Sequence, residues 1–229
     1  MDTNPKRVAG RRAAELVADG MTLGLGTGST VFFFLERLAE RIRDEGLTLR
    51  GVPTSLDTER KAREMGIPLV GLDQVEGLDL TVDGADEIDG RFDMIKGGGG
   101  ALLREKVVAS ITRREVVVVG PEKLVERLGT TFELPVEVVP FALPVVARRL
   151  AALGCEPRLR APRDGGDYRT DNGNAVLDCR FPEGIRDAPA TELAILTVPG
   201  VVECGLFIGL AHVLVIGHAD GRAEVRERP

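Results

Sequence analysis

The order of structural elements is set by residues 21–44, MTLGLGTGSTVFFFLERLAERIRD. Its first six residues form a short apolar run that predicts a strand, and a helix is expected from Ser29 to Asp44. The two are joined by GLGTGST, residues 24–30, whose glycines permit a tight turn. A strand, a glycine-rich turn and a helix in this order are typical of a chain that alternates strands and helices.

The alternation continues on both sides of this stretch, over the first 125 residues. Apolar side chains at helical spacing predict a helix over residues 5–19, with Pro5 at its start and Gly20 as its stop. Further helices are expected at residues 56–66 and 101–112, and further strands in RGVPTS (50–55) and at Ile67–Val70, Leu78–Val82 and Val116–Val119. Right-handed crossovers then give a Rossmann-like α/β fold, with a largely parallel sheet and helices on both faces.

The pattern changes after Thr130. A small α+β, ferredoxin-like domain is predicted by the succession of strand-like LPVEVVP, helical PVVARRLAALG, strand-like CEPRLRAP and AVLDCRF, and a helix at Glu192–Leu196. The apolar segments GVVECGLFIG and HVLVIGHADG are expected to return to the first sheet. We therefore expect a Rossmann-like catalytic domain of residues 1–130 and 204–229, and a small α+β domain of residues 131–203.

Composition excludes several classes of protein. A net charge of −6, no Trp and one Tyr work against nucleic-acid binding, which needs a basic face and stacking platforms. No apolar run approaches the roughly 18–20 residues of a membrane helix, and the amino terminus lacks the apolar core of a signal peptide, so a cytoplasmic protein is expected. No metal site is predicted, because no zinc-ligand spacing appears among Cys155, Cys179, Cys204, His212 and His218.

The glycine-rich turn has the features of a phosphate site. Its glycines let main-chain N–H groups approach an anion, its hydroxyls add donors, and the next helix directs its positive end at the same place. The residues concerned are Gly24, Gly26, Thr27, Gly28, Ser29 and Thr30. The alternative is a turn that only tightens strand–helix packing. Nucleotide binding is the weaker interpretation, because no Lys follows the last glycine and Ser29 interrupts GxGxxG.

Two carboxylates follow an apolar strand in DLTVDGADEID, residues 79–89. Asp83 and Asp86 stand where open α/β sheets bind ligands, at the carboxyl end of a strand. Three residues apart around a Gly–Ala turn, both can accept hydrogen bonds from sugar hydroxyls or relay their protons. Ordinary turn and capping chemistry is the alternative.

A run of four glycines lies in KGGGGALLREKVVAS, residues 96–110. Such a run has a large entropic cost but exposes N–H groups to a ligand, and Lys96 at its rim can bind an oxyanion. Glu105 falls in the helix that follows, of which Leu102, Leu103 and Val107 are expected to form the apolar side. By spacing alone, Glu105 fits better on a solvated face, paired with neighbouring Arg104 or Lys106.

The motifs GLGTGST, DGADEID, KGGGGALLREK and TDNGN, in this order, resemble the A-type ribose-5-phosphate isomerase family over essentially the whole chain. The resemblance implies an enzyme of the non-oxidative pentose phosphate pathway without metal or organic cofactor, acting as a homodimer or homotetramer. It implies Glu105 as the proton-transferring base, with Asp83, Asp86 and Lys96 as the other catalytic residues. The implied substrate-binding residues are Lys6, Thr27, Gly28, Ser29, Thr30, Asp83, Gly84, Ala85, Asp86, Lys96, Gly97, Gly98, Gly99 and Lys123.

The residue types suit aldose–ketose isomerisation, in which a proton moves from C2 to C1 through an enediolate. Lys96 and glycine N–H groups are expected to stabilise the developing oxyanion, and the two aspartates to handle hydroxyl protons. Two other functions stay open: a sugar-phosphate-sensing domain without catalysis, and an isomerase or deaminase of another sugar phosphate. One departure from the family is Gly120-Pro121-Glu122, where relatives often carry an acidic residue first.

Overall fold

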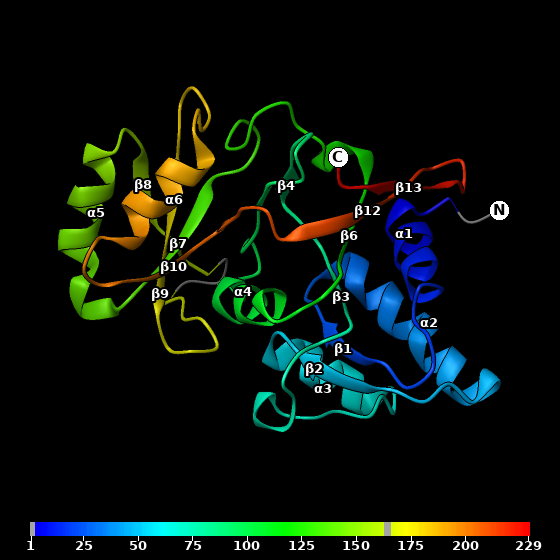
Figure 1. Cartoon of the computed structure of the whole chain (residues 1–229). Coiled ribbons are helices and arrows are strands. Elements are labelled where there is room, and N and C mark those ends of the chain that lie inside the picture. Colours follow the sequence, from blue (N-terminus) through cyan, green and yellow to red (C-terminus); the bar gives the residue numbers. More distant parts are fainter. Residues whose placement is uncertain (1–2, 163–165) are drawn as a thin grey trace. The chain divides into compact units, whose positions relative to one another are not determined.

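The computed structural model describes residues 3–162 and 166–229, which form two compact units (Figure 1). The first unit comprises Met1–Ala85, Arg104–Leu124 and Leu210–Pro229, and the second comprises Asp86–Leu103 and Val125–Gly209. The second unit thus takes in residues 86–103, 125–130 and 204–209, which the sequence analysis places with the first sheet. None of the helices within the described ranges has the length and apolar character needed to span a bilayer.

The first unit is built on a six-stranded sheet in the order β13-β12-β6-β3-β1-β2. All its neighbouring strands are parallel except β12 and β13, which pair antiparallel at one edge. Parallel order places the carboxyl ends of β1, β3 and β6 at one edge of the sheet. The strands are β1 (Thr22–Leu25), β2 (Arg50–Pro53), β3 (Leu80–Asp83), β6 (Glu115–Val119), β12 (Ala211–Gly217) and β13 (Ala223–Glu227).

Helices cover both faces of this sheet. In β6, Val116 and Val118 lie in the main core together with Phe34 of α2. On the other face of the sheet, Gly24 of β1 lies against Val108 of α4. A Cβ on Gly24 would stand 2.6 Å from the valine side chain. The helices are α1 (Pro5–Ala14), α2 (Ser29–Glu45), α3 (Leu56–Glu64) and α4 (Leu102–Ser110), with short 3-10 turns η1 (Leu72–Gln74) and η2 (Pro121–Lys123). These observations confirm the Rossmann-like α/β class.

The second unit contains a four-stranded antiparallel sheet in the order β10-β7-β9-β8. With its two helices the chain order is βαββαβ, the ferredoxin-like arrangement expected from the sequence. A smaller three-stranded sheet has the order β11-β5-β4. The elements are β4 (Glu87–Ile88), β5 (Met94–Ile95), β7 (Leu134–Val138), η3 (Pro140–Ala142), α5 (Leu143–Ala152), β8 (Glu156–Leu159), β9 (Ala175–Arg180), α6 (Ala188–Leu196), β10 (Val201–Cys204) and β11 (Leu206–Phe207).

Some expected elements were wrong. The first helix ends at Ala14 instead of residue 19, because Arg41 of α2 donates to the carbonyls of Ala14 (2.6 Å) and Val17 (2.9 Å) and so replaces their helical partners. Ile67–Val70 is no strand, and only an isolated bridge from Gly51 to Leu69 remains. Pro68 lacks the N–H group that a continuing ladder needs.

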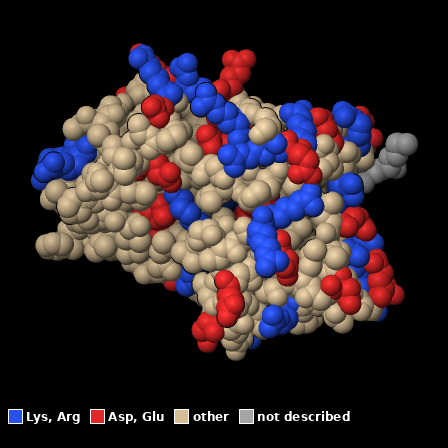
Figure 2. All heavy atoms as spheres, viewed as in Figure 1, with Lys and Arg blue, Asp and Glu red and all other residues tan. Residues whose placement is uncertain are grey.

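The final apolar segments divide between the sheets. HVLVIGHADG contributes most of β12 and returns to the first sheet as expected. GVVECGLFIG does not; it forms β10 and β11 in the two sheets of the second unit. The three cysteines are buried free thiols, as expected of small apolar residues in a core. On the face that Figure 2 shows, Lys and Arg lie among Asp and Glu.

Candidate functional site

The glycine-rich turn leads from β1 to the amino-terminal end of α2. Gly28 is the N-cap and has no side chain to occupy the first N–H groups of α2. The ammonium of Lys6 donates to the hydroxyl of Ser29 at 2.9 Å, so a cation and a hydroxyl meet at the positive end of this helix. The structure therefore brings together Lys6 and Ser29, two residues predicted from distant parts of the sequence, in an arrangement suited to an anion.

Thr27 is held differently from its neighbours. Its hydroxyl lies 2.8 Å from the hydroxyls of Thr54 and Ser55, in a cluster at the start of α3. Thr27 N donates to the Asp83 carboxylate at 3.0 Å. The side chain of Thr27 thus fixes the turn to its own unit, while Gly28, Ser29 and Thr30 form the part of the turn at the helix end.

Asp83 ends β3 and is buried. Its Oδ1 accepts hydrogen bonds from Thr27 N and from Gly84 N (2.7 Å). Gly26 passes so close that a Cβ there would stand 2.3 Å from Oδ1. Asp83 therefore shapes the phosphate turn, an arrangement that the spacing of the two motifs did not predict.

Glu105 is 6% exposed, so the expectation of a solvated helix face is wrong. The buried face of α4 carries Leu102, Glu105 and Val108, whereas Val107 is 41% exposed. The apolar side was therefore misplaced at Val107 by one residue. A carboxylate on the buried face of a helix is a candidate catalytic acid or base.

Lys123 follows β6, at the same edge of the sheet as the turn after β1 and Asp83 at the end of β3. The stretch Gly120-Pro121-Glu122 that departs from the family begins the 3-10 turn η2, closed by a bond from Lys123 N to Gly120 O (3.2 Å). Lys123 therefore lies in a short, defined turn.

In the second unit, the β4–β5 hairpin holds Asp86 and Lys96 at its two open ends. Asp86 N donates to Ile95 O at 2.8 Å, and Lys96 N donates to Gly205 O at 2.9 Å. The Lys96 side chain is 3% exposed, and its Nζ lies 5.4 Å from the centroid of the Phe207 ring. A cation over an aromatic face is held in direction as well as in place.

The glycine run continues directly from Lys96. Gly98 N donates to the Asp86 carboxylate at 2.8 Å. Gly97 (φ 102°) and Gly100 (φ 81°) have left-handed backbones, which side chains other than glycine rarely adopt. The run is therefore a shaped loop in which Asp86 holds one N–H group.

Glu87 of β4, next to Asp86, is a buried residue that was not predicted from the sequence. Its carboxylate accepts hydrogen bonds from Gly129 N (2.5 Å), Thr131 N (2.5 Å), Thr131 Oγ1 (2.6 Å) and Phe132 N (2.7 Å). The carboxylate thereby anchors the strand that starts next to Asp86. A glutamate inside a two-residue strand leaves no periodic signal in the sequence.

Glu87→Gln is expected to lower the free energy of unfolding by about 2–4 kcal/mol, because an amide cannot accept from all four donors and turns its own NH₂ toward some of them. Chemical denaturation followed by circular dichroism measures the loss. Glu156→Gln, an exposed position on β8 in the same unit, is the matched control and should change stability by less than about 0.5 kcal/mol. Equal stability of the two variants would contradict the anchoring role.

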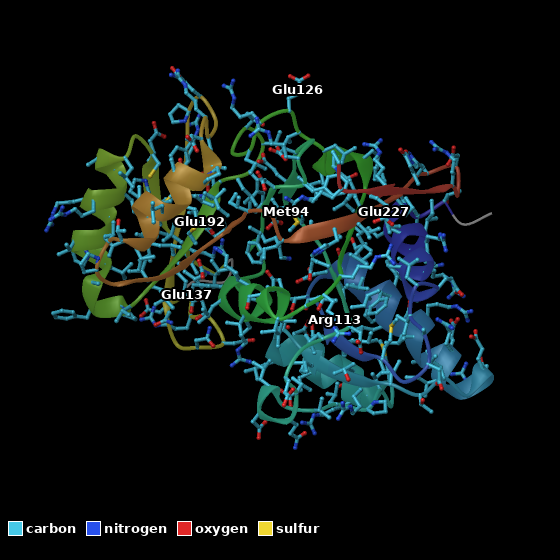
Figure 3. All side chains as sticks on the ribbon, viewed as in Figure 1. Met94, Arg113, Glu126, Glu137, Glu192 and Glu227 are labelled. Carbon is cyan, nitrogen blue, oxygen red and sulfur yellow. The ribbon has the colours of Figure 1, made fainter. Side chains whose placement is uncertain are left out.

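The TDNGN segment, residues 170–174, binds a second buried carboxylate. Glu137 of β7, labelled in Figure 3, accepts at Oε1 from Thr170 Oγ1 (2.8 Å), Asn172 Nδ2 (3.2 Å) and Asn174 Nδ2 (2.8 Å). This motif therefore ties a loop to the four-stranded sheet. Within the described ranges, one group of three side chains has metal-ligating atoms close together, Glu192, Glu203 and Cys204, and it contains none of the predicted site residues.

Comparison with known proteins gives consistent results. The family model described as ribose 5-phosphate isomerase A (phosphoriboisomerase A) matches residues 50–221. A protein from Bacillus mycoides (strain KBAB4) named ribose-5-phosphate isomerase A is 46% identical over 221 residues, 96% of this chain and 99% of that relative. One of the same name from Roseiflexus castenholzii (strain DSM 13941 / HLO8) is 52% identical, covering 96% of this chain and 94% of that relative.

Solved structures agree with these matches. The ribose 5-phosphate isomerase A of Methanocaldococcus jannaschii superposes with a TM-score of 0.92 at 41% identity, over 97% of each chain. A D-ribose-5-phosphate isomerase in complex with phospho-erythronic acid has a TM-score of 0.94 at 36% identity, over 98% of this chain and 100% of that one. The similarity in sequence and in fold extends over nearly the whole chain.

Proposed function

The chain belongs to the ribose 5-phosphate isomerase A family, and we propose that Glu105 is the base with which it interconverts D-ribose 5-phosphate and D-ribulose 5-phosphate. The protein is an aldose–ketose isomerase. The observation that carries the role of Glu105 is its place on the buried face of α4, where a carboxylate is removed from bulk water. Burial of this kind suits a group that must exchange a proton with carbon.

The reaction moves two protons. Glu105 takes the proton from C2 of the open-chain aldose, which gives an enediolate with its negative charge on O1. The proton of the O2 hydroxyl passes to O1, and Glu105 returns its proton to C1 as the C2 carbonyl forms, which gives the ketose. Asp83 and Asp86 relay the hydroxyl protons, with Asp86 next to the glycine run whose Gly98 N–H it accepts.

Negative charge that develops on the oxygen atoms needs a fixed positive partner. Lys96 provides it, since its ammonium is buried and oriented by the Phe207 ring. The N–H groups of Gly97 and Gly99 contribute further donors, as in other oxyanion-binding loops, while the N–H group of Gly98 is held by Asp86. Both are in place before the reaction, so they stabilise the charge without reorganising.

The phosphate group binds at the start of α2. Lys6, Ser29, Thr30 and Lys123 supply charge and hydroxyl donors, and Gly28 leaves the N–H groups of the helix end open. Gly84 and Ala85 line the sugar, and Thr27 contributes by keeping the turn in shape, since its N–H group and its hydroxyl bind within the unit. Binding energy from the phosphate orients the reacting carbons, which are remote from it.

Incubation with ribose 5-phosphate tests the function directly, because the ketopentose product has an absorbance that the aldose lacks. Steady appearance of the ketose supports the proposal. A sugar-phosphate-sensing domain would bind ribose 5-phosphate without producing ketose, and an isomerase or deaminase of another sugar phosphate would turn over a hexose phosphate instead.

Activity is expected to survive exhaustive treatment with EDTA, because a carboxylate base and a lysine electrophile suffice for the reaction without a metal. The measurement compares initial rates before treatment, after treatment and after Mg²⁺, Mn²⁺ or Zn²⁺ is returned. Complete loss that a divalent metal restores would overturn the cofactor-free mechanism.

We also propose that the enzyme acts in the cytoplasm as a homodimer or homotetramer. The family resemblance supports this proposal. Light scattering on the purified protein distinguishes the two assemblies, and a monomer of 24.6 kDa that is fully active would contradict both.

A further inference from the structure

Three consecutive carbonyl oxygens of the glycine run accept hydrogen bonds from side chains elsewhere in the second unit. Arg160, just after β8, donates through Nη1 to Gly97 O at 2.9 Å and to Gly98 O at 3.3 Å. The hydroxyl of Tyr168 donates to Gly99 O at 3.3 Å. One side of the loop is therefore covered by donors, although the loop has no side chains of its own.

The Arg160 guanidinium is itself held on several sides. Its Nε donates to Asp178 Oδ2 at 3.0 Å and its Nη2 to Asp178 Oδ1, a forked pair in which both side chains are nearly buried. The Tyr168 ring centroid lies 5.3 Å from its Cζ. Burial is the largest single effect and acts to lower the pKa of Arg160, but the hydrogen bonds and negative charge of Asp178, together with Tyr168, outweigh it and keep the pKa above its ordinary value. Arg160 is thus a permanent, rigid cation.

The contacts of Arg160 determine where the amide N–H groups point. In a trans peptide, the carbonyl of one residue and the N–H of the next have opposite directions. Because the carbonyls of Gly97 and Gly98 both face Arg160, the N–H groups of Gly98 and Gly99 both face away from it. Asp86 accepts from Gly98 N, and Gly99 is an exposed residue whose N–H group follows next along the loop.

We propose that Arg160, held by Asp178 and Tyr168, is a positioning residue that locks the Gly98–Gly99 peptide with its N–H group toward the enediolate oxygen. This inference rests on the proposed function, in which the glycine run and Lys96 stabilise that oxygen. Glycine peptides rotate easily because they carry no side chains. A rotated Gly98–Gly99 peptide presents its carbonyl oxygen to the oxyanion, which replaces an attraction by a repulsion.

The test replaces Arg160 by Ala in the full chain. We expect kcat for ribose 5-phosphate to fall about 10- to 100-fold, with KM within about threefold of wild type, because the lost donor acts mainly in the transition state. Guanidinium ion at millimolar concentration is expected to restore part of kcat, and urea at the same concentration is not.

A binding measurement separates positioning from general structure. Phospho-erythronic acid has a carboxylate where the substrate has its reacting carbons, so its affinity reports on the oxyanion donors. Arg160→Ala should weaken phospho-erythronic acid at least about tenfold and change inhibition by inorganic phosphate by less than about twofold. Parallel loss of both affinities would show a structural role only and overturn the inference.

Two further variants keep the test decisive if Arg160→Ala folds poorly. Arg160→Lys retains the positive charge beside Asp178. The single ammonium group of lysine cannot bind Asp178 and also the carbonyls of Gly97 and Gly98, so the variant should fold and still lose most of kcat. Tyr168→Phe removes the bond to Gly99 O, keeps the ring over Arg160, and should lower kcat only a few-fold.

Arg158→Ala is the matched control, since Arg158 lies on β8, is 73% exposed and pairs with Glu133. It should leave kcat within about twofold of wild type. If the wild-type protein does not isomerise ribose 5-phosphate, the proposed function fails. If the wild-type protein is active and both Arg160 variants have the same kcat as wild type, only the positioning role of Arg160 is wrong.

Discussion

Glu105→Gln is expected to lower kcat by at least about a hundredfold and to leave KM nearly unchanged. Glutamine has the shape of glutamate but cannot accept a proton from carbon, so both transfers between C2 and C1 lose their base. Substrate affinity depends on the phosphate and hydroxyl contacts, which the substitution leaves in place. Initial rates of ketose formation over a range of ribose 5-phosphate concentrations measure both constants.

The control for Glu105→Gln is Glu64→Gln at the end of α3, where the side chain is exposed and pairs with Arg60. It should have wild-type kinetics. Near wild-type kcat in Glu105→Gln would remove Glu105 from the role of base. Similar thermal melting of both variants and wild type shows that any loss of rate comes from the chemistry.

Lys96→Met is expected to lower kcat by about 10²- to 10³-fold, the usual result of removing a main oxyanion donor. Methionine has a similar length and can contact the Phe207 ring as Lys96 does, so the loss of charge is the principal change. Loss of a buried charge that has partners is expected to lower stability, so kcat is measured well below the melting temperature of the variant. The measurement is kcat at saturating ribose 5-phosphate, together with the melting temperature.

Lys61→Met is a matched control for Lys96→Met, because Lys61 also places its Nζ near an aromatic ring, 5.9 Å from the centroid of Phe32. Lys61 pairs with Asp57 within α3 and is not one of the predicted site residues. Removing Lys61 should leave kcat within about twofold of wild type. If Lys96→Met also retains wild-type kcat, charge stabilisation by Lys96 is excluded.

Long, regular elements were predictable from the sequence. The strand, glycine turn and helix of residues 21–44 appear as β1 and α2 within a residue or two, because apolar runs and glycine stops act locally. The β4–β5 hairpin was not predictable, since each of its strands has two residues and the outer pairing of β5 is with β11, more than a hundred residues away. Short elements held by distant partners have no local signature.

The buried position of Glu105 was not predictable from spacing either. Two adjacent leucines and two adjacent valines flank it, so the apolar side of α4 fits two rotations of the helix. Packing decided between them, since Val108 contacts Val52 and Leu78 in a small core. Only the resemblance to the family singled out Glu105 as a candidate base, and that role stays a prediction.

The TDNGN motif helped to recognise the family, but its residues take no part in the chemistry proposed for the site. Its Thr and Asn side chains bind the buried carboxylate of Glu137 on β7. The partner lies more than thirty residues earlier in the chain, so no spacing rule connects the two. A buried carboxylate with three donors is sufficient physical reason for this combination of residues.

The most direct test of the mechanism is the fate of the C2 proton when ribose 5-phosphate is isomerised in D₂O and followed by ¹H NMR. Transfer by Glu105 through an enediolate predicts that, over many turnovers, deuterium enters C1 of ribulose 5-phosphate and C2 of the recovered ribose 5-phosphate. The Glu105→Gln variant should show neither exchange nor ketose on the same time scale. Ketose formed by the wild-type enzyme with no deuterium at carbon would indicate a hydride shift and contradict the role assigned to Glu105.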